Sequence, residues 1–215
     1  MQVRGHVLGD TEDVWGDIFQ RMGETYQPPK LDLFSGTAAS ACGLIGAATG
    51  RFYCASDHEI YLERSFFQEL SERYGVSGEF ARAFVIAQQV GHHVQNQLGL
   101  MDKVHARMAA ASGPQRNSLS VDLELQADCF AGVWGNSAAK RGLIDASDID
   151  SGIAAAMALG DDRLQQASRG PEEFTHDSSA QRAKWFKVGL ESGDIRQCNT
   201  FASRNPQTPP GNRRP

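Results

Sequence analysis

The chain has 215 residues, of which 40% are hydrophobic and 22% charged, and its formal net charge is −5 at pH 7. The length suggests one domain, and the composition is ordinary for a globular protein. The negative charge argues against nucleic acid as a partner, because nucleic-acid-binding domains usually carry a basic surface. The sequence has no run of about 18 apolar residues, so no membrane span is expected within it.

The N-terminal part of the sequence predicts one helix followed by a small sheet. Asp10 or Thr11 can cap the helix, and Gly23 can end it. Short apolar segments predict three strands, at residues 31–34, 51–55 and 59–62. Residues 35–50, between the first two strands, are rich in glycine, alanine and serine, and a loop is expected there.

The rest of the sequence is predicted to be helical. Apolar periodicity and stop signals place four helices at residues 80–98, 118–141, 147–159 and 178–193. Ser77 can cap the first of these, while Ser147 with Asp150 and Ser178 with Gln181 have the spacing of a capping box. Many helices and a small sheet near the start predict a mostly helical α+β fold.

Four cysteines stand far apart in the sequence, at Cys42, Cys54, Cys129 and Cys198. None forms a C-x-x-C pair, so a zinc ribbon is not expected. The spacing alone fits two disulfides in an oxidising compartment, and equally four buried thiols.

The stretch from Phe84 to Gly99 comes close to the zinc-protease pattern His-Glu-x-x-His. In that pattern two histidines one turn apart hold zinc, and the glutamate acts as general base. Here Gln88 takes the first-ligand position, Gln89 the base position and His92 the second-ligand position. A neutral amide is a poor zinc ligand, and an amide cannot take a proton near neutral pH. The alternative is a set of ordinary polar residues on an amphipathic helix.

Two acids one helical turn apart, Glu124 and Asp128, lie among small and apolar residues of the sequence. Carboxylates in such surroundings need partners, and zinc proteases often take a third ligand from a later helix. The alternative is a pair of solvated acids on a helix surface.

These motifs and others in the same order resemble the neutral zinc metallopeptidase family of bacteria (YpfJ-type), over roughly residues 10 to 201. The matching pieces are Asp10–Gly16, Tyr26–Leu31, the Cys42–Cys54 loop, Val85–Gln95, Glu124–Trp134, Gly160–Gln166, Phe174–His176, Gln181–Arg182, Trp185–Phe186 and Cys198–Phe201.

The resemblance implies a zincin-like domain in which a zinc-activated water hydrolyses peptide bonds. It makes His92 the second zinc ligand and Glu124 the third, with Asp128 orienting a ligand. Gln88 and Gln89 then fill the first-ligand and base positions without the chemistry those positions need.

The resemblance also implies how the chain is organised and where it acts. Residues 1–9 are expected to link a preceding membrane anchor to a metallopeptidase-like domain at 10–202, followed by a disordered tail at 203–215. The domain is expected on the periplasmic or extracellular face of a bacterial membrane. In that setting the resemblance favours the disulfides Cys42–Cys54 and Cys129–Cys198. His176 is either a group that steadies the oxyanion or a structural histidine.

Four functional hypotheses follow. In the first, the chain is a catalytically impaired family member that keeps a peptide-binding site. In the second, it is an inactivated variant of an active enzyme of the family. In the third, it is a non-catalytic scaffold domain. A rebuilt metal site is the fourth, with His92, Glu124 and either His176 or His93 as ligands. Adjacent helical residues point about 100° apart, which disfavours His92 and His93 on one ion.

Overall fold

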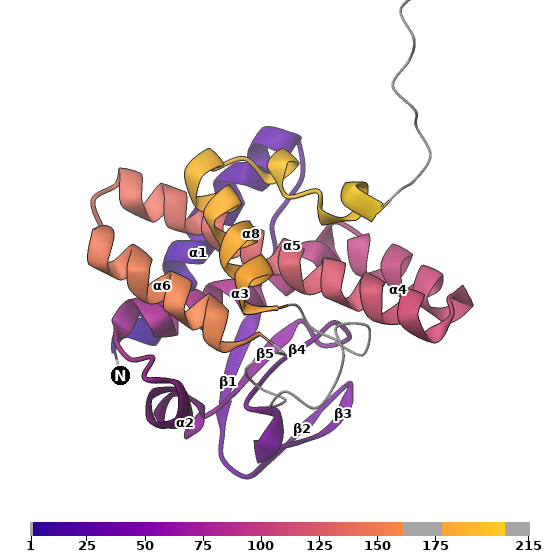
Figure 1. The fold of residues 1–215 in the computed structure, drawn as a ribbon, viewed down its shortest axis with the longest axis horizontal. Coiled ribbons are helices and arrows are strands. Elements are labelled where there is room, and N and C mark those ends of the chain that lie inside the picture. Colours follow the sequence, from indigo (N-terminus) through magenta and orange to yellow (C-terminus); the bar gives the residue numbers. More distant parts are fainter. Residues whose placement is uncertain (1, 161–177, 205–215) are drawn as a thin grey trace, which may run out of the picture.

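The computed structural model describes residues 2–160 and 178–204, and its mostly helical α+β architecture confirms the predicted class (Figure 1). The helices are α1 (Gln2–Met22), α2 (Phe66–Tyr74), α3 (Glu79–Gln97), α4 (Leu100–Ala110), α5 (Gly113–Lys140), α6 (Ala146–Ala158) and α8 (Ser179–Ser192). The strands are β1 (Lys30–Phe34), β2 (Thr37–Ser40), β3 (Gly43–Gly46), β4 (Arg51–Cys54) and β5 (Glu59–Glu63). The described residues also form three short 3-10 turns, η1 (Ala47–Thr49), η3 (Ile195–Gln197) and η4 (Thr200–Arg204).

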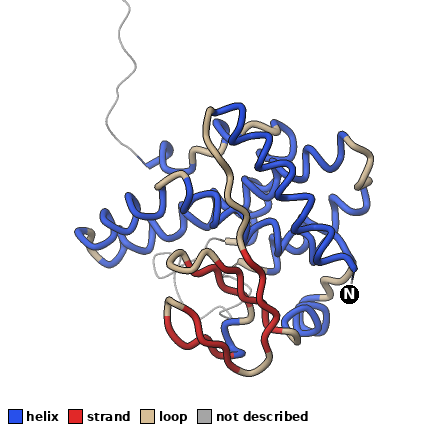
Figure 2. Tube along the Cα trace, turned by 180° about the vertical axis from the view of Figure 1, so that it is seen from behind, coloured by secondary structure: helices blue, strands red, loops and turns tan. Residues whose placement is uncertain are grey.

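The strands gather on one side of the molecule, and most of the helices lie on the other (Figures 1 and 2). The larger sheet has the order β1-β5-β4, with β1 parallel and β4 antiparallel to β5. Strands β2 and β3 form a separate hairpin, so the loop predicted over residues 35–50 is wrong for most of its length. The segment lacks the alternation of large apolar residues that signals strands.

Helix α3 runs through the centre of the domain, and 15 of its 19 residues are buried. It packs against α1, α5, α6 and strand β4. A Cβ on Gly91 would lie 2.7 Å from the carbonyl oxygen of Ala127, so only glycine allows α3 and α5 to approach this closely. A Cβ on Gly189 of α8 would meet the carbonyl oxygen of Cys129 at 1.9 Å. These glycines bring α3, α5 and α8 together around the site.

The predicted start of the first helix is wrong, because α1 begins at Gln2 rather than after Asp10 or Thr11. Inside the helix, the hydroxyl of Thr11 donates to the carbonyl of Leu8 at 2.6 Å. The carboxylate of Asp10 accepts from Trp134 Nε1 at 2.7 Å and from Arg141 Nη2 at 2.8 Å. Both residues therefore make contacts that compete with a capping role.

The N-terminal caps of α6 and α3 differ from the prediction, whereas that of α8 agrees with it. Helix α6 is capped by Asp145 instead of Ser147, since Asp145 Oδ1 accepts from the Ser147 amide at 2.8 Å. Helix α3 begins after Gly78, so Ser77 is not its cap. Helix α8 is capped by Ser178, as predicted, with the Ser178 hydroxyl accepting from the amide of Gln181.

Both disulfides implied by the family resemblance are present. Cys42–Cys54 ties the turn before β3 to strand β4, and Cys129–Cys198 ties α5 to the segment after η3. Among the described residues, no helix combines the length and apolarity that crossing a membrane requires. The predicted tail at 203–215 falls almost wholly outside the described residues.

Candidate functional site

Helices α3 and α5 bring Gln88, His92 and Glu124 within hydrogen-bonding distance of one another. Nε2 of Gln88 lies 2.9 Å from Nε2 of His92 and 3.1 Å from Oε2 of Glu124. Nε2 of His92 and Oε1 of Glu124 are 3.3 Å apart. The side chains of His92 and Glu124 are 10% and 17% exposed, so this cluster can be reached from solvent. Gln88 itself is fully buried.

The amide of Gln88 bridges the other two residues through its two N–H groups. Its oxygen accepts a hydrogen bond from Nε2 of Gln89, which fixes the amide with its nitrogen toward His92 and Glu124. One N–H then donates to the lone pair of His92 Nε2, and the other donates to the Glu124 carboxylate. Every polar atom of the Gln88 side chain has a partner in this arrangement.

A hydrogen bond to Gln95, one turn further along α3, fixes the orientation of the His92 ring. Oε1 of Gln95 lies 3.0 Å from Nδ1 of His92, so Nδ1–H donates and Nε2 is left to accept. Nε2 of Gln95 donates to the carbonyl of Leu123 at 2.8 Å and to Oε1 of Gln126 at 3.1 Å. Gln126 in turn donates to the carbonyl of Cys198 at 2.9 Å. A buried chain of amides thus connects His92 to a disulfide cysteine.

Asp128, predicted to orient a metal ligand, is fully buried and binds Arg182 of α8. Two guanidinium nitrogens donate to its carboxylate at 2.8 and 2.7 Å. Burial raises the pKa of Asp128 to about 6, and the charge of Arg182 opposes the rise. Nη1 of Arg182 lies 3.7 Å from Oε2 of Glu124 and donates to the carbonyl of Leu159 at 3.1 Å. Arg182 therefore links Asp128 to Glu124.

His93 lies on a different face of α3 from His92, against the sheet. Its Nδ1 is 2.9 Å from the hydroxyl of Tyr53, and its Nε2 is 2.6 Å from the carbonyl oxygen of Gln27. Burial lowers the pKa of His93 to about 4, the bond to Gln27 raises it, and His58 lowers it. Both ring nitrogens are occupied, so His93 does not join His92 in a metal site. His176 falls outside the described residues.

The described residues do not fit a catalytic zinc ion. Such a site needs three protein ligands, and here only His92 and Glu124 offer suitable donors. The third position presents the N–H₂ group of Gln88, which has no lone pair to give to a metal. Within residues 2–160 and 178–204, no group of three His, Cys, Asp or Glu side chains could hold a metal ion.

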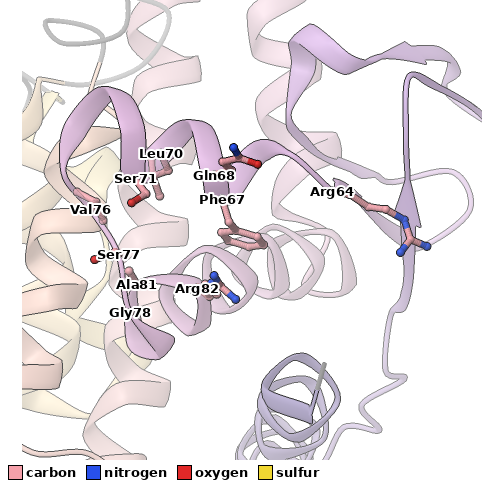
Figure 3. Close-up of a pocket in the computed structure, with 10 residues that line it drawn as sticks. All are labelled: Arg64, Phe67, Gln68, Leu70, Ser71, Val76, Ser77, Gly78, Ala81 and Arg82. Atoms are coloured by element: carbon pink, nitrogen blue, oxygen red, sulfur yellow. The ribbon is translucent and has the colours of Figure 1, made fainter.

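A separate cavity of about 310 Å³ lies between α2 and the start of α3 (Figure 3). Its walls carry Phe67, Leu70 and Val76 together with the exposed side chains of Arg64 and Arg82. None of its lining residues belongs to the Gln88–His92–Glu124 cluster, so it is a distinct surface.

Gln95 and Arg182 are functional-site residues that were not predicted from the sequence. Gln95 stands three residues after His92, the spacing at which a helical side chain can reach back to it. Arg182 lies on the same helix face as the buried residues Phe186 and Gly189, and a cation on such a face needs a buried acid. The spacing gave a detectable signal for Gln95, whereas the identity of the acid that pairs with Arg182 depends on tertiary structure.

Comparison with known proteins gives consistent matches over nearly the whole chain. The family model described as "Putative neutral zinc metallopeptidase" matches residues 1–201. Uncharacterized protein YpfJ of Escherichia coli strain K12 is 48% identical over 198 residues, which cover 91% of this chain and 69% of that relative. Uncharacterized proteins Mb2605 of Mycobacterium bovis and Rv2575 of Mycobacterium tuberculosis strain H37Rv are each 42% identical over 220 residues, covering 94% of this chain and 71% of theirs. No solved structure matches at a significant level.

Proposed function

This chain belongs to the neutral zinc metallopeptidase family, and on that premise we propose that it binds peptides at the family's site without hydrolysing them. The observation that carries the proposal is the position of the Gln88 amide, which donates hydrogen bonds to both His92 and Glu124. A third metal ligand would have to occupy this same position between the two side chains. A bound zinc ion would polarise the peptide carbonyl and activate the attacking water. Neither effect is available from a hydrogen-bonded amide.

The base position supports the same conclusion. Gln89 is nearly isosteric with glutamate, but its side chain cannot take a proton from water near neutral pH. General-base catalysis contributes about 10²- to 10⁴-fold to such reactions. Gln89 is 3% exposed and donates to Gln88, so it supports the hydrogen-bonded cluster instead.

Peptide binding is supported by what the site retains. His92 and Glu124 remain partly exposed, and the Glu124 carboxylate can accept hydrogen bonds from peptide N–H groups. The buried supports of the site, Gln95 and the Asp128–Arg182 pair, are fully satisfied by hydrogen bonds. A site held in one geometry loses less entropy when a ligand binds.

The proposal extends to the compartment. Two disulfides and no free cysteine among the described residues support a protein that works in an oxidising compartment, such as the bacterial periplasm or the outer face of a membrane. Alkylation of the unreduced, denatured protein from its native cells tests this proposal. Four reactive thiols would contradict it.

A paired binding and cleavage assay tests the function. A mixed, fluorescently labelled peptide library is added to the purified protein with and without zinc. We expect saturable binding with no cleavage in either condition. A matched Glu124→Gln variant reports on the site itself. Zinc-dependent cleavage that this variant loses would overturn the non-hydrolysing assignment, and absence of any peptide binding would overturn the binding assignment.

A further inference from the structure

Strand β4 presents one face to the helix that carries the site. Alternate residues of a strand share a face, so the side chains of Arg51 and Tyr53 leave β4 on the same side. The hydroxyl of Tyr53 lies 2.9 Å from Nδ1 of His93 and accepts from Nδ2 of Asn96 at 3.0 Å, both residues of α3. Phe52, on the other face, packs with the apolar cluster beside the β2–β3 hairpin. Arg51 therefore lies on the face of β4 that looks toward α3.

Charged groups of α5 and α8 influence the pKa of Arg51. Burial lowers the pKa of Arg51 to about 10, the charge of Arg182 lowers it further, and the carboxylates of Glu124 and Asp128 raise it. The three charged groups that act on Arg51 are thus those of the site. Arg51 is thus a second guanidinium, besides that of Arg182, and it lies on the face of the sheet that packs against α3.

Unlike the guanidinium of Arg182, that of Arg51 has a buried nitrogen without an acceptor among the described residues. Its Nε is buried, and no described residue accepts a hydrogen bond from it. Its guanidinium carbon lies 5.6 Å from the centre of the Phe66 ring, a cation–π contact that gives Nε no hydrogen-bond acceptor. A Cβ on Gly50 would lie 2.5 Å from the same ring, so the backbone before Arg51 also fits closely against Phe66.

A buried guanidinium donor without an acceptor is costly, and a carboxylate is the acceptor whose planar shape matches it best. Arg182 is already engaged by Asp128. Glu124 accepts from Gln88 and lies 3.7 Å from Arg182, so its charge is already partly compensated. A carboxylate supplied by a ligand would give Arg51 the partner that the described residues do not.

We propose that Arg51 binds a carboxylate group of the peptide held at the Gln88–His92–Glu124 cluster. The inference rests on the proposed peptide-binding function and adds a preference to it. The carboxylate belongs either to the C-terminus of the peptide or to an aspartate or glutamate side chain.

Fluorescence anisotropy with paired peptide pools tests the proposal and separates these two sources. One pair of hexapeptide pools differs only in a free or amidated C-terminus. The second pair is amidated and differs only in glutamate or glutamine at randomised positions. Each pool is titrated with the unmodified protein and with its Arg51→Gln, Arg51→Lys and Arg64→Gln variants. Arg64 is an exposed arginine outside the site and serves as the matched control. Thermal unfolding verifies that every variant is folded.

We expect the unmodified protein to prefer the carboxylate member of one pair by roughly tenfold or more, as a charge-assisted hydrogen bond provides. Arg51→Gln should remove the preference, Arg51→Lys should keep part of it, and Arg64→Gln should leave it unchanged. Equal binding of both members of each pair by the unmodified protein would overturn the carboxylate preference and leave the peptide-binding function standing. Binding of no pool would overturn both. If Arg51→Gln fails to fold, a reduced preference in a folded Arg51→Lys variant supports the contact with Arg51, and an undiminished preference overturns it.

Discussion

The side-chain nitrogen of Gln88 lies 2.9 Å from Nε2 of His92, one helical turn further along α3. In a zinc protease, the residues at these two positions share a metal ion. Here they share a hydrogen bond, and the same nitrogen also donates to Glu124 at 3.1 Å. The two N–H bonds of one amide thus connect His92 of α3 to Glu124 of α5.

Replacement of Gln88 by histidine should create a zinc site. Gln88→His places a second imidazole one turn before His92, and with Glu124 it completes three protein ligands. We expect close to one zinc per chain, measured by isothermal titration calorimetry. Gln89→Glu is the control, since it adds a base but leaves Gln88 in place, and it should bind no zinc. If Gln88→His binds no zinc either, loss of the metal site extends beyond its first ligand.

The double variant Gln88→His/Gln89→Glu should then differ from Gln88→His in catalysis rather than in metal content. The restored glutamate supplies a general base, worth about 10²- to 10⁴-fold. Peptide cleavage at equal zinc occupancy is the measurement. Equal rates for the single and double variants would show that Gln89 does not occupy the base position.

Gln95→Leu should destabilise the protein, because it removes the acceptor for His92 Nδ1 and a donor to the carbonyl of Leu123. A buried polar group left without a partner costs about 1–3 kcal/mol, measurable by urea unfolding. In the Gln88→His background, we expect the same change to weaken zinc binding about 10- to 100-fold, as loss of a ligand-orienting partner does. Gln68→Leu, on the exposed face of α2, should change neither quantity appreciably.

Two aspartate–arginine pairs allow a matched test of burial. Asp128 and Arg182 have no exposed side-chain surface, whereas the side chain of Arg196, which pairs with Asp194, is 85% exposed. Asp128→Asn leaves a buried cation without its counter-charge and should cost about 3–5 kcal/mol. Asp194→Asn should cost less than about 1 kcal/mol, as exposed pairs do. Similar losses of unfolding free energy in the two variants would contradict the assigned role of Asp128.

Acid should destabilise the junction between β5 and α2. Hydrogen bonds from the side chain and backbone of Ser65 hold the pKa of Glu63 below the value of 4.5 for an unperturbed glutamate. The folded state therefore binds fewer protons here than the unfolded state, and the stabilisation is present above about pH 4.5 and lost as the pH falls through the folded pKa. In the Ser65→Ala variant, the free energy of unfolding should fall less steeply between about pH 5 and about pH 3 than in the unmodified protein. Urea unfolding at each pH measures this free energy. Superimposable pH profiles would exclude this contribution.

The sequence was most informative where local spacing decides the structure. The i, i+4 relation of Gln88 and His92 and the cap at Ser178 are properties of a single helix, and the structure contains both. The hairpin at 37–46 was missed because small residues give no strand alternation. The cap of α6 was misplaced because Asp145 and Ser147 are both good caps two residues apart.

The supporting residues of the site were beyond prediction for a different reason. Arg182 meets Asp128 across 54 positions of sequence, and Arg51 comes from a strand packed beside α3. Which acid a buried arginine finds depends on how α5 and α8 pack, and that packing is set by glycine contacts such as that of Gly189 with Cys129. Residue spacing carries no information about such contacts.

The zinc content of the unmodified protein is the most direct test of a hydrogen-bonded site without metal. Protein dialysed against excess zinc is separated from unbound metal, and its zinc is counted by mass spectrometry beside Gln88→His and Glu124→Gln variants. We predict far less than one zinc per chain in the unmodified protein and close to one in Gln88→His. One zinc per unmodified chain, lost on Glu124→Gln, would contradict the proposal that the Gln88 amide has replaced the metal.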